Sequence, residues 1–261
     1  TGFNIAWNDN RILETYKTES GAPYEVQMGP NAFKIKYVEG GRYGDIYVNS
    51  FARDENGHIK INDAGNYENA VPVMASGKYE TKVGNMTSPV TLGWNNTFTW
   101  KNFTLYFLID GRIGGKVMSL TEADLDLYGL SERSAQDRLN GERVMQNGKE
   151  YILKPLPDGS GNKVSVENYY TTIGPLPMED HVYNATSLRM RDISLSYDMP
   201  NLFGKNQGMT AQFSVKNAFF IYKDSPVDPD ISVSAANGYS GIDCYSLPTT
   251  RSFALTLKFN F

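Results

Sequence analysis

Two groups of carboxylates are the main candidates for acid–base chemistry in this 261-residue chain. The first group consists of Glu122, Asp124 and Asp126, and the second consists of Asp224, Asp228 and Asp230. The first stands where a helix is expected to begin, and negative side chains complement the helix dipole there. The second lies in a segment rich in Asp, Pro, Ser and Gly, in which carboxylates commonly stabilise turns. A structural role therefore explains both groups better than a catalytic pair does.

Residues that usually carry nucleophilic or metal chemistry are scarce. The chain has two histidines, His58 and His181, and one cysteine, Cys244. A single cysteine excludes an internal disulfide and a multi-cysteine metal site. The sequence contains no HExxH, P-loop, GxSxG or CxxC pattern. We therefore expect a protein that is not an enzyme and that holds no cofactor or metal.

Charge and composition exclude further classes of protein. The 25 basic and 29 acidic residues give a net charge of −4, so a nucleic-acid-binding protein with a concentrated basic face is not expected. An apolar content of 40% excludes intrinsic disorder. No apolar run approaches the roughly 20 residues that a transmembrane helix needs. A membrane β-barrel stays compatible with this composition, because its strands alternate apolar and polar residues.

Six segments show that alternation, as strands with two different faces do. They lie near 2–13, 90–100, 103–117, 187–199, 208–222 and 251–261. In the last one, Leu255 and Leu257 alternate with Thr256, which predicts leucines that face lipid and a threonine that faces the interior. At about 3.4 Å per residue and a tilt of about 45°, this segment spans about 26 Å along the membrane normal, close to the apolar band of an outer-membrane barrel. The alternation slips near Arg191 and Asp192, which predicts a β-bulge.

The connections between these segments alternate in length. Short turns are expected at Lys101 and Asn102 and at 200–207, whereas the long loops lie at 14–89, 118–186 and 223–250. Antiparallel strands place the two kinds at opposite ends of a sheet. Short turns on one side and long loops on the other are typical of bacterial outer-membrane barrels. A soluble β-sandwich, which also has alternating strands, is the alternative.

The second long loop is expected to carry a small helical insertion over 120–141. Loops of this length are seldom without structure of their own. Thr121 is the expected N-cap of a first helix, Gly129 interrupts that helix, and Ser131 is the expected N-cap of a second one.

Three motifs follow one another in the second half of the chain. Residues 180–200 (DHVYNATSLRMRDISLSYDMP) contain an LR pair, a short alternating strand and a Tyr-x-x-Pro. Residues 217–230 (NAFFIYKDSPVDPD) contain an Asn, an aromatic run and an Asp-Pro-acid, and residues 245–261 contain a Pro-Thr-x-Arg and a terminal aromatic strand. The ordered set resembles the C-terminal part of SusC/RagA-type TonB-dependent transporters, with Ala218 where the family usually has Leu. The matching residues are Leu188, Arg189, Tyr197, Pro200, Asn217, Asp228, Pro229, Asp230, Pro248, Thr249, Arg251 and Phe261.

The resemblance implies an all-β fold, namely the last six antiparallel strands of a barrel of about 22 strands in the bacterial outer membrane. Six strands are fewer than the smallest membrane barrels need, so a signal peptide, a TonB-contacting segment and a plug domain are expected upstream. The implied function is TonB-dependent import of oligosaccharides or oligopeptides. The implied partners are a SusD-like surface lipoprotein as a lid, TonB acting through the N-terminal part, the rest of the barrel with its plug, and membrane lipid. The alternative function is that of a soluble, secreted glycan-binding β-sandwich.

Polar and aromatic residues in the long loops are the candidates for contact with substrate or lid. They are Tyr169, Tyr170, Asp228, Asp230 and Tyr245. The loops are expected on the extracellular side, where such groups could hydrogen-bond to a solute and stack on it. The alternative is that the loops pack on one another, with the tyrosines as their small core. Phe261 is expected to be the last paired residue of the final strand.

The stretch 54–63 (DENGHIKIND) corresponds to a region that resembles an EF-hand calcium loop in the family. Calcium loops place oxygen ligands at positions 1, 3 and 5, a Gly at 6 and a Glu at 12. Asp54 and Asn56 fit this pattern, but His58 stands at position 5, Ile59 replaces the Gly and Gly65 replaces the Glu. An ordinary turn at the Asn-Gly pair therefore explains the stretch better than a metal site does.

Overall fold

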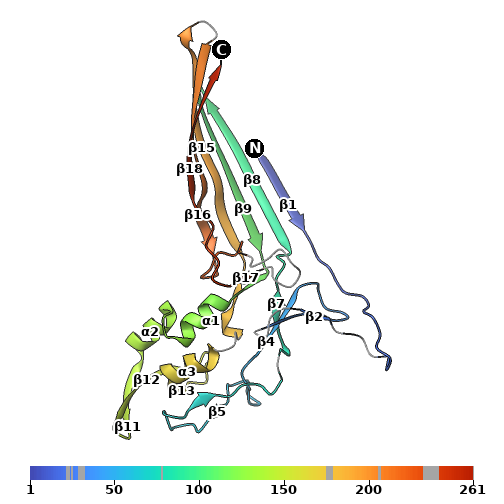
Figure 1. Cartoon of the computed structure of the whole chain (residues 1–261), viewed down its shortest axis with the longest axis vertical. Helices are drawn as coiled ribbons and strands as arrows, with labels where there is room; N and C mark the ends of the chain where they lie inside the picture. The colour runs from blue at the N-terminus through green and yellow to red at the C-terminus, as the bar shows by residue number, and fades with distance from the viewer. Residues whose placement is uncertain are drawn as a thin grey trace.

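The computed structural model describes residues 1–21, 24, 26–28, 33–77, 79–174, 179–204, 207–231 and 241–260. Six of its strands form one antiparallel sheet in chain order (Figure 1). These strands are β1 (Gly2–Trp7), β8 (Val90–Trp100), β9 (Phe103–Ile113), β15 (Ser187–Gly204), β16 (Gln207–Lys223) and β18 (Ser252–Asn260). The predicted all-β fold with six antiparallel strands is confirmed. Phe261, the expected last residue of the sheet, lies outside the described residues.

The strand ends differ from the expected ones for local reasons. β1 ends at Trp7 rather than near residue 13, because the polar run that follows it no longer alternates. β9 ends at Ile113 because Gly114 and Gly115 adopt φ angles of 75° and 80°, which a strand does not accommodate. The register of β15 shifts between Met190 and Asp192 against both of its neighbours, which confirms the predicted bulge.

Neighbouring strands align their residues into rows, and the rows alternate between two faces. One row across five strands consists of Phe98, Leu105, Leu195, Phe213 and Leu255. The adjacent row, on the opposite face, consists of Thr99, Thr104, Ser196, Gln212 and Thr256. In these two rows the sheet has an apolar face and a polar face.

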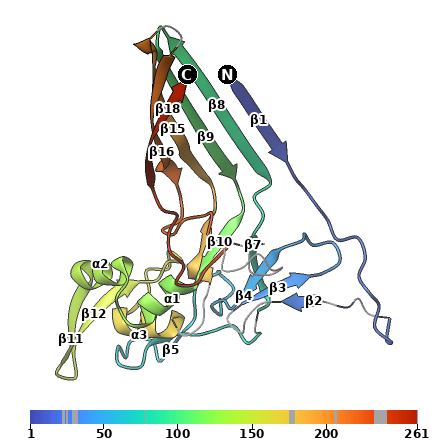
Figure 2. The same ribbon diagram turned by 45° about the horizontal axis from the view of Figure 1, so that its top comes forward.

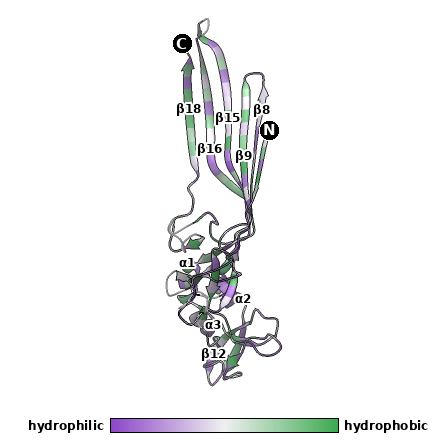
Figure 3. Ribbon diagram, turned by 90° about the vertical axis from the view of Figure 1, so that its right-hand side faces the viewer, coloured by the Kyte–Doolittle hydropathy of each residue, from purple (hydrophilic) through white to green (hydrophobic). Residues whose placement is uncertain are grey.

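Nothing in the described part of the chain covers the apolar face. Viewed edge-on, the sheet stands as a single layer, and the other elements gather beyond one of its ends (Figure 3). Phe3 is 65% exposed and Leu255 is 69% exposed. A soluble β-sandwich would bury such residues under a second sheet. The described residues contain no second sheet at that position, which speaks against the sandwich alternative.

The three long connections fold together beyond one end of the sheet, and the short turns lie at the other end (Figures 1 and 2). The first connection contains β2 (Val26–Met28), β3 (Lys34–Tyr37), β4 (Asp45–Val48), β5 (Ile61–Asn62), β6 (Val71–Pro72) and β7 (Thr81–Asn85). The second contains β10 (Lys116–Ser119), α1 (Leu120–Leu127), α2 (Glu132–Asn140), β11 (Glu142–Gln146), β12 (Lys149–Pro155), β13 (Lys163–Ser165), α3 (Val166–Ile173), the 3-10 turn η1 (Glu179–His181) and β14 (Val182–Asn184). The third contributes β17 (Ile242–Asp243), which pairs in parallel with β10.

Two small hydrophobic cores hold the connections together. The first core joins Phe51 and Ile59 of the first connection to residues of α3, β13 and their surroundings in the second. The second core joins all three connections through Ile46, Met118 and Ile242, which are at most 2% exposed. The loops therefore form one folded unit, referred to below as the loop unit.

The predicted two-part helical insertion is present, with one corrected cap. Gly129 separates α1 from α2 with a φ of 67°, and Ser131 caps α2 by accepting a hydrogen bond from the Ser134 N–H. The prediction of Thr121 as the cap of α1 is wrong. Ser119 holds that position, and its hydroxyl accepts the Glu122 N–H at 3.0 Å. Among the described residues, none of the helices is long and apolar enough to cross a membrane.

The two faces of β18 predict different responses to a buried charge. Leu257 lies on the apolar face and Thr256 on the polar face. Leu257→Arg should lower the free energy of unfolding in lipid vesicles by about 2–4 kcal/mol if position 257 lies near the bilayer centre, because the substitution places a guanidinium in hydrocarbon. Thr256→Arg is the matched control and should cost less. Equal losses in a lipid refolding titration of the full-length barrel would contradict the assignment of the faces.

Candidate functional site

Six charged side chains meet on the polar face, where the sheet joins the loop unit. This arginine–aspartate cluster consists of Arg112, Arg189, Arg191, Asp110, Asp228 and Asp230. Two of its members, Asp228 and Asp230, are site residues expected from the sequence. The structure brings them together with the arginine of the LR pair and with charged residues from β9.

Local strand geometry explains how residues from different strands converge here. Asp110 and Arg112 alternate along β9, so both side chains lie on the polar face. Arg189 is the cross-strand partner of Asp110. The bulge after Met190 adds one residue to β15, and the Arg191 side chain reaches Asp110 as well. The two arginines of β15 share one carboxylate, that of Asp230.

The ion pairs of the cluster are short and centred on two carboxylates. Arg189 Nη2 lies 2.5 Å from Asp228 Oδ1, and the side chains of both residues are only 4% exposed. Asp230 receives three guanidinium groups, from Arg112 at 2.7 Å, from Arg191 at 2.8 Å and from Arg189 at 3.2 Å. Arg191 also lies 2.5 Å from Asp110 Oδ2. Three positive charges face three negative charges, so the cluster is neutral within itself.

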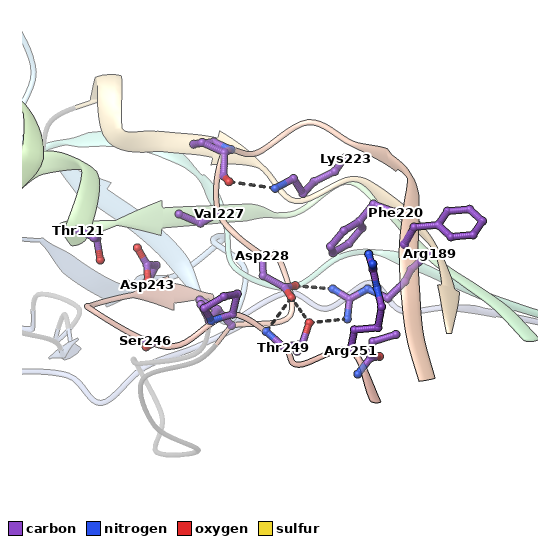
Figure 4. Close-up of a pocket in the computed structure, with 15 residues that line it drawn as sticks. Thr121, Arg189, Phe220, Lys223, Val227, Asp228, Asp243, Ser246, Thr249 and Arg251 are labelled. Atoms are coloured by element: carbon purple, nitrogen blue, oxygen red, sulfur yellow. Dashed lines mark hydrogen bonds and ion pairs between the residues drawn. The ribbon is translucent and has the colours of Figure 1, made fainter. Parts of the chain in front are cut away.

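The cluster ties both arms of the third connection to the sheet (Figure 4). On the first arm, Asp228 Oδ1 also accepts the backbone N–H of Asp230 at 3.0 Å, which closes a local turn. On the second arm, the Thr249 hydroxyl donates to Asp228, and Arg189 donates to that hydroxyl oxygen at 3.2 Å. Beside it, Asn217 donates to the Thr250 carbonyl at 3.1 Å. These contacts fix the path of the chain into β18.

The protonation of Asp228 follows from these partners. Burial by itself would raise the pKa of this carboxyl. Hydrogen bonds from Thr249 and from the Asp230 N–H, together with the positive charge of Arg189, outweigh burial and hold the pKa of Asp228 below its usual range. The carboxylate is therefore ionised at neutral pH and fully used by its partners. Because these partners hold the Asp228 carboxylate, we assign it the role of an anchor.

A pocket of about 460 Å³ borders the cluster on the side of β16 and the third connection. Its lining includes Arg189, Phe220, Thr249 and Arg251 (Figure 4). The Arg189 guanidinium lies 4.0 Å from the centre of the Phe220 ring, a cation–π contact that further orients the arginine. The anchor thus forms one wall of a polar and aromatic hollow.

The remaining site residues expected from the sequence lie elsewhere. Tyr169 and Tyr170 are on α3, where they are 1% and 3% exposed and belong to the first hydrophobic core. Their hydroxyls donate to Asp180 and Asp137, and burial raises the pKa of both phenols above the usual value. Both rings thus pack inside the loop unit. This agrees with the alternative given above, in which the loops pack on one another and the tyrosines form their small core. Tyr245 is exposed, and its backbone N–H donates to the Thr121 hydroxyl at 2.8 Å.

A second buried polar cluster has no signal in the sequence. Asp126, expected to complement a helix dipole, is buried and accepts hydrogen bonds from Ser131 at 2.6 Å and Arg133 Nε at 3.0 Å. His181 Nε2 lies 2.9 Å from the same carboxylate. Burial alone would raise the pKa of Asp126, but hydrogen bonds from His181, Arg133 and Ser131 outweigh it and lower the pKa. The cluster joins α1, α2 and η1, segments whose contact no local pattern reveals.

The stretch 54–63 has the geometry of a turn. Asp54 Oδ1 accepts the backbone N–H groups of Asn56 and His58, each at 2.9 Å. Asp158, from the second connection, accepts the Ile59 N–H at 2.6 Å. Both carboxylates are thus engaged by backbone donors. Within the described ranges, no three His, Cys, Asp or Glu side chains are arranged to hold a metal ion.

Comparison with known proteins supports the resemblance noted from the motifs. No family model matches the chain. The TonB-dependent receptor P3 of Formosa agariphila is 20% identical over 288 residues, which cover 100% of this chain and 26% of the relative. A structure of the RagAB peptide transporter superposes with a TM-score of 0.59 and 15% identity, over 99% of this chain and 27% of the other. The RagAB peptide importer in its open-open state gives a TM-score of 0.58 and 16% identity, over 99% and 26%.

The chain therefore spans about a quarter of the length of the relatives it matches. Its likeness to the C-terminal part of SusC/RagA-type TonB-dependent transporters is confirmed by both kinds of comparison. The six-stranded sheet resembles part of the barrel of the RagAB peptide transporter.

The anchor predicts a local loss of order when one of its carboxylates is neutralised. Asp228→Asn leaves the buried Arg189 without its nearest carboxylate, and breaking a buried pair costs about 3–5 kcal/mol. Hydrogen exchange of the full-length protein should then speed up in residues 224–231 and 249–251. The control is Glu150→Gln, which breaks the exposed Arg143–Glu150 pair at a cost of at most about 1 kcal/mol. Unchanged exchange in both segments of the Asp228 variant would contradict the anchoring role.

The lowered pKa of Asp228 predicts the pH range in which the anchor weakens. A carboxyl with a depressed folded-state pKa stabilises the fold above its unfolded pKa of about 3.9, and that stabilisation is lost as pH falls through the lower folded-state value. A nitroxide attached at the exposed position Leu247 should therefore keep its mobility from pH 7 to about pH 5 and gain mobility below about pH 4. In the Asp228→Asn background the acid-induced gain should be absent. A transition near pH 6 would assign the effect to another group.

Proposed function

We propose that this chain forms the last part of the barrel wall of a TonB-dependent outer-membrane transporter that imports oligopeptides or oligosaccharides. The observation that carries the proposal is the single-layer sheet with one uncovered apolar face and one polar face. A wall between lipid and a hydrated interior requires that division. The relatives of known structure are described as a peptide transporter and a peptide importer, so oligopeptides are the first substrates to test.

In this proposal the sheet and the loop unit have separate roles. The polar face lines the interior, where it contacts the plug or the passing solute. The loop unit, on the extracellular side, forms part of the substrate chamber and carries a SusD-like lipoprotein lid. The arginine–aspartate cluster holds the third connection against the wall, so that Tyr245 and its neighbours present a fixed surface. TonB supplies energy through the N-terminal part of the protein.

Uptake measurements test the transport function. Cells that express the full-length protein together with its lipoprotein partner should accumulate a fluorescent oligopeptide. Accumulation should disappear when tonB is deleted, although the amount of protein in the outer membrane stays the same. Uptake that is independent of TonB would contradict active import. Uptake of labelled oligosaccharides but not of peptides would keep the transport function and change its substrate class.

Cysteine labelling tests the sidedness. In a Cys244→Ser background, Leu247→Cys in the third connection should react with a membrane-impermeant maleimide on intact cells, because residue 247 is 89% exposed in the loop unit. Lys101→Cys, in the exposed short turn between β8 and β9, should stay unlabelled until the outer membrane is permeabilised. The opposite pattern would invert the topology and remove the loop unit from the extracellular side.

A further inference from the structure

Strand β16 extends beyond its neighbour β18 at the end that leads into the third connection. β18 pairs with β16 from Gly208 to Lys216, whereas β16 continues to Lys223. On its other side, β16 stays paired with β15 up to Lys223. Within the part of the chain that the structure describes, residues 217–223 thus have a strand on one side only, and they are called the free edge below. A free strand edge presents backbone N–H and C=O groups that can pair with another chain.

The pocket of about 460 Å³ beside the arginine–aspartate cluster lies along this free edge. The residues of β16 that line it are Asn217, Phe219, Phe220 and Lys223. Consecutive residues of a strand point to opposite faces, so a hollow lined by both Phe219 and Phe220 borders the edge of the strand rather than one face. The facing wall comes from both arms of the third connection, among them Val227 and Thr249 (Figure 4). The volume falls within the range of about 300–1,000 Å³ that is typical of ligand pockets.

The charges of the pocket favour an anionic group. Its lining contributes three cations and two carboxylates, namely Arg189, Lys223, Arg251, Asp228 and Asp243. Arg189 and Asp228 neutralise each other, and Asp243 accepts a 2.6 Å hydrogen bond from the Ser119 hydroxyl. The Lys223 ammonium donates to the Pro226 carbonyl at 3.0 Å. Among the described residues, no carboxylate forms an ion pair with the exposed Arg251, so its guanidinium is available to a ligand.

We infer that an extended oligopeptide pairs with the free edge of β16 and that Arg251 binds its C-terminal carboxylate. The inference rests on the proposed function and deepens it, because it assigns oligopeptides as the substrate class and gives them a site. Extended peptides add to sheet edges through main-chain hydrogen bonds, which depend little on the peptide sequence. An oligosaccharide lacks the regularly spaced N–H and C=O groups that a free strand edge pairs with.

The position of Arg251 determines the direction of the peptide. Arg251 directly precedes Ser252, the partner of Lys216, so it stands where the free edge begins. A peptide antiparallel to β16 continues the line of β18 and brings its C-terminus to this end. Its carboxylate then accepts charge-assisted hydrogen bonds from the Arg251 guanidinium. At about 3.4 Å per residue the free edge is about 24 Å long, which matches a peptide of about seven residues.

Peptide binding to the full-length transporter, purified in detergent with its lipoprotein partner, tests the role of Arg251 independently of membrane sidedness. The probe is a heptapeptide of alanine and serine with a fluorescent label at its N-terminus, and the measurement is fluorescence anisotropy. Arg251→Gln should weaken binding of this peptide about tenfold, because a hydrogen bond to a charged group is lost. The C-terminal amide of the same peptide should bind the parent protein and the variant equally. The matched control is Arg143→Gln, which removes an exposed guanidinium of the loop unit on β11 and should leave both affinities unchanged.

Hydrogen exchange and modified peptides test the free edge itself. Bound peptide should slow amide exchange in residues 217–223, because the N–H groups that point away from β15 gain acceptors. Alternate amides of an antiparallel peptide face its partner strand. N-methylation of that set should weaken binding about tenfold or more, whereas N-methylation of the intervening set should be tolerated.

Three outcomes would overturn the inference. Equal affinity of the parent protein and Arg251→Gln for the peptide with a free carboxylate would remove Arg251 from the site. Peptide binding without slower exchange in residues 217–223 would place the peptide elsewhere. Slow exchange there with the lipoprotein alone, unchanged by peptide, would make a segment of that partner the occupant. In each case TonB-dependent peptide uptake by the same cells would leave the transport function standing, whereas uptake independent of TonB would contradict that function itself.

Discussion

A sheet that stands alone between lipid and water must satisfy its backbone hydrogen bonds from strand to strand and must separate its side chains by face. Every other feature of this chain depends on that constraint. It explains the apolar row and the adjacent polar row that cross five strands, and it explains why the loops gather beyond the end of the sheet and leave its apolar face uncovered. The loop unit, which lies beyond the end of the sheet, must then be held to the sheet by a few specific contacts.

Arg189 and Arg191 of β15 supply those contacts. They reach carboxylates of β9 and of the third connection. The Arg189–Asp228 pair at the centre of the resulting cluster is buried, and the cluster is neutral within itself. Such a network orients the chain more than it stabilises the fold, because the cost of removing its ions from water offsets the attraction between them. It holds the last loop and the start of β18 in one place relative to the wall.

The sequence predicts the strands well because period-two alternation is a local signal, and the six strands follow from it together with the bulge. Contacts between distant segments are not encoded locally. Asp228 and Asp230 were identified through a motif, but their pairing with Arg189 depends on a sheet register that the motif does not contain. Tyr169 and Tyr170 have a ring and a hydroxyl that suit either a surface or a core, and packing against Phe51 decides for the core. Ser119 and Thr121 are both residue types that cap helices, and the end of β10 at Ser119 decides between them.

The second hydrophobic core has a consequence for the order of assembly. It joins Phe33 and Ile46, near the start of the chain, to Ile242, which is followed shortly by β18. Contacts between residues so far apart in sequence form slowly, because a long segment must be ordered before they contribute. The loop unit therefore cannot be completed until the segment that contains Ile242 is present. Since β18 follows Ile242 by only a few residues, completion of the loop unit and pairing of β18 with β16 are coupled steps in the folding of this chain.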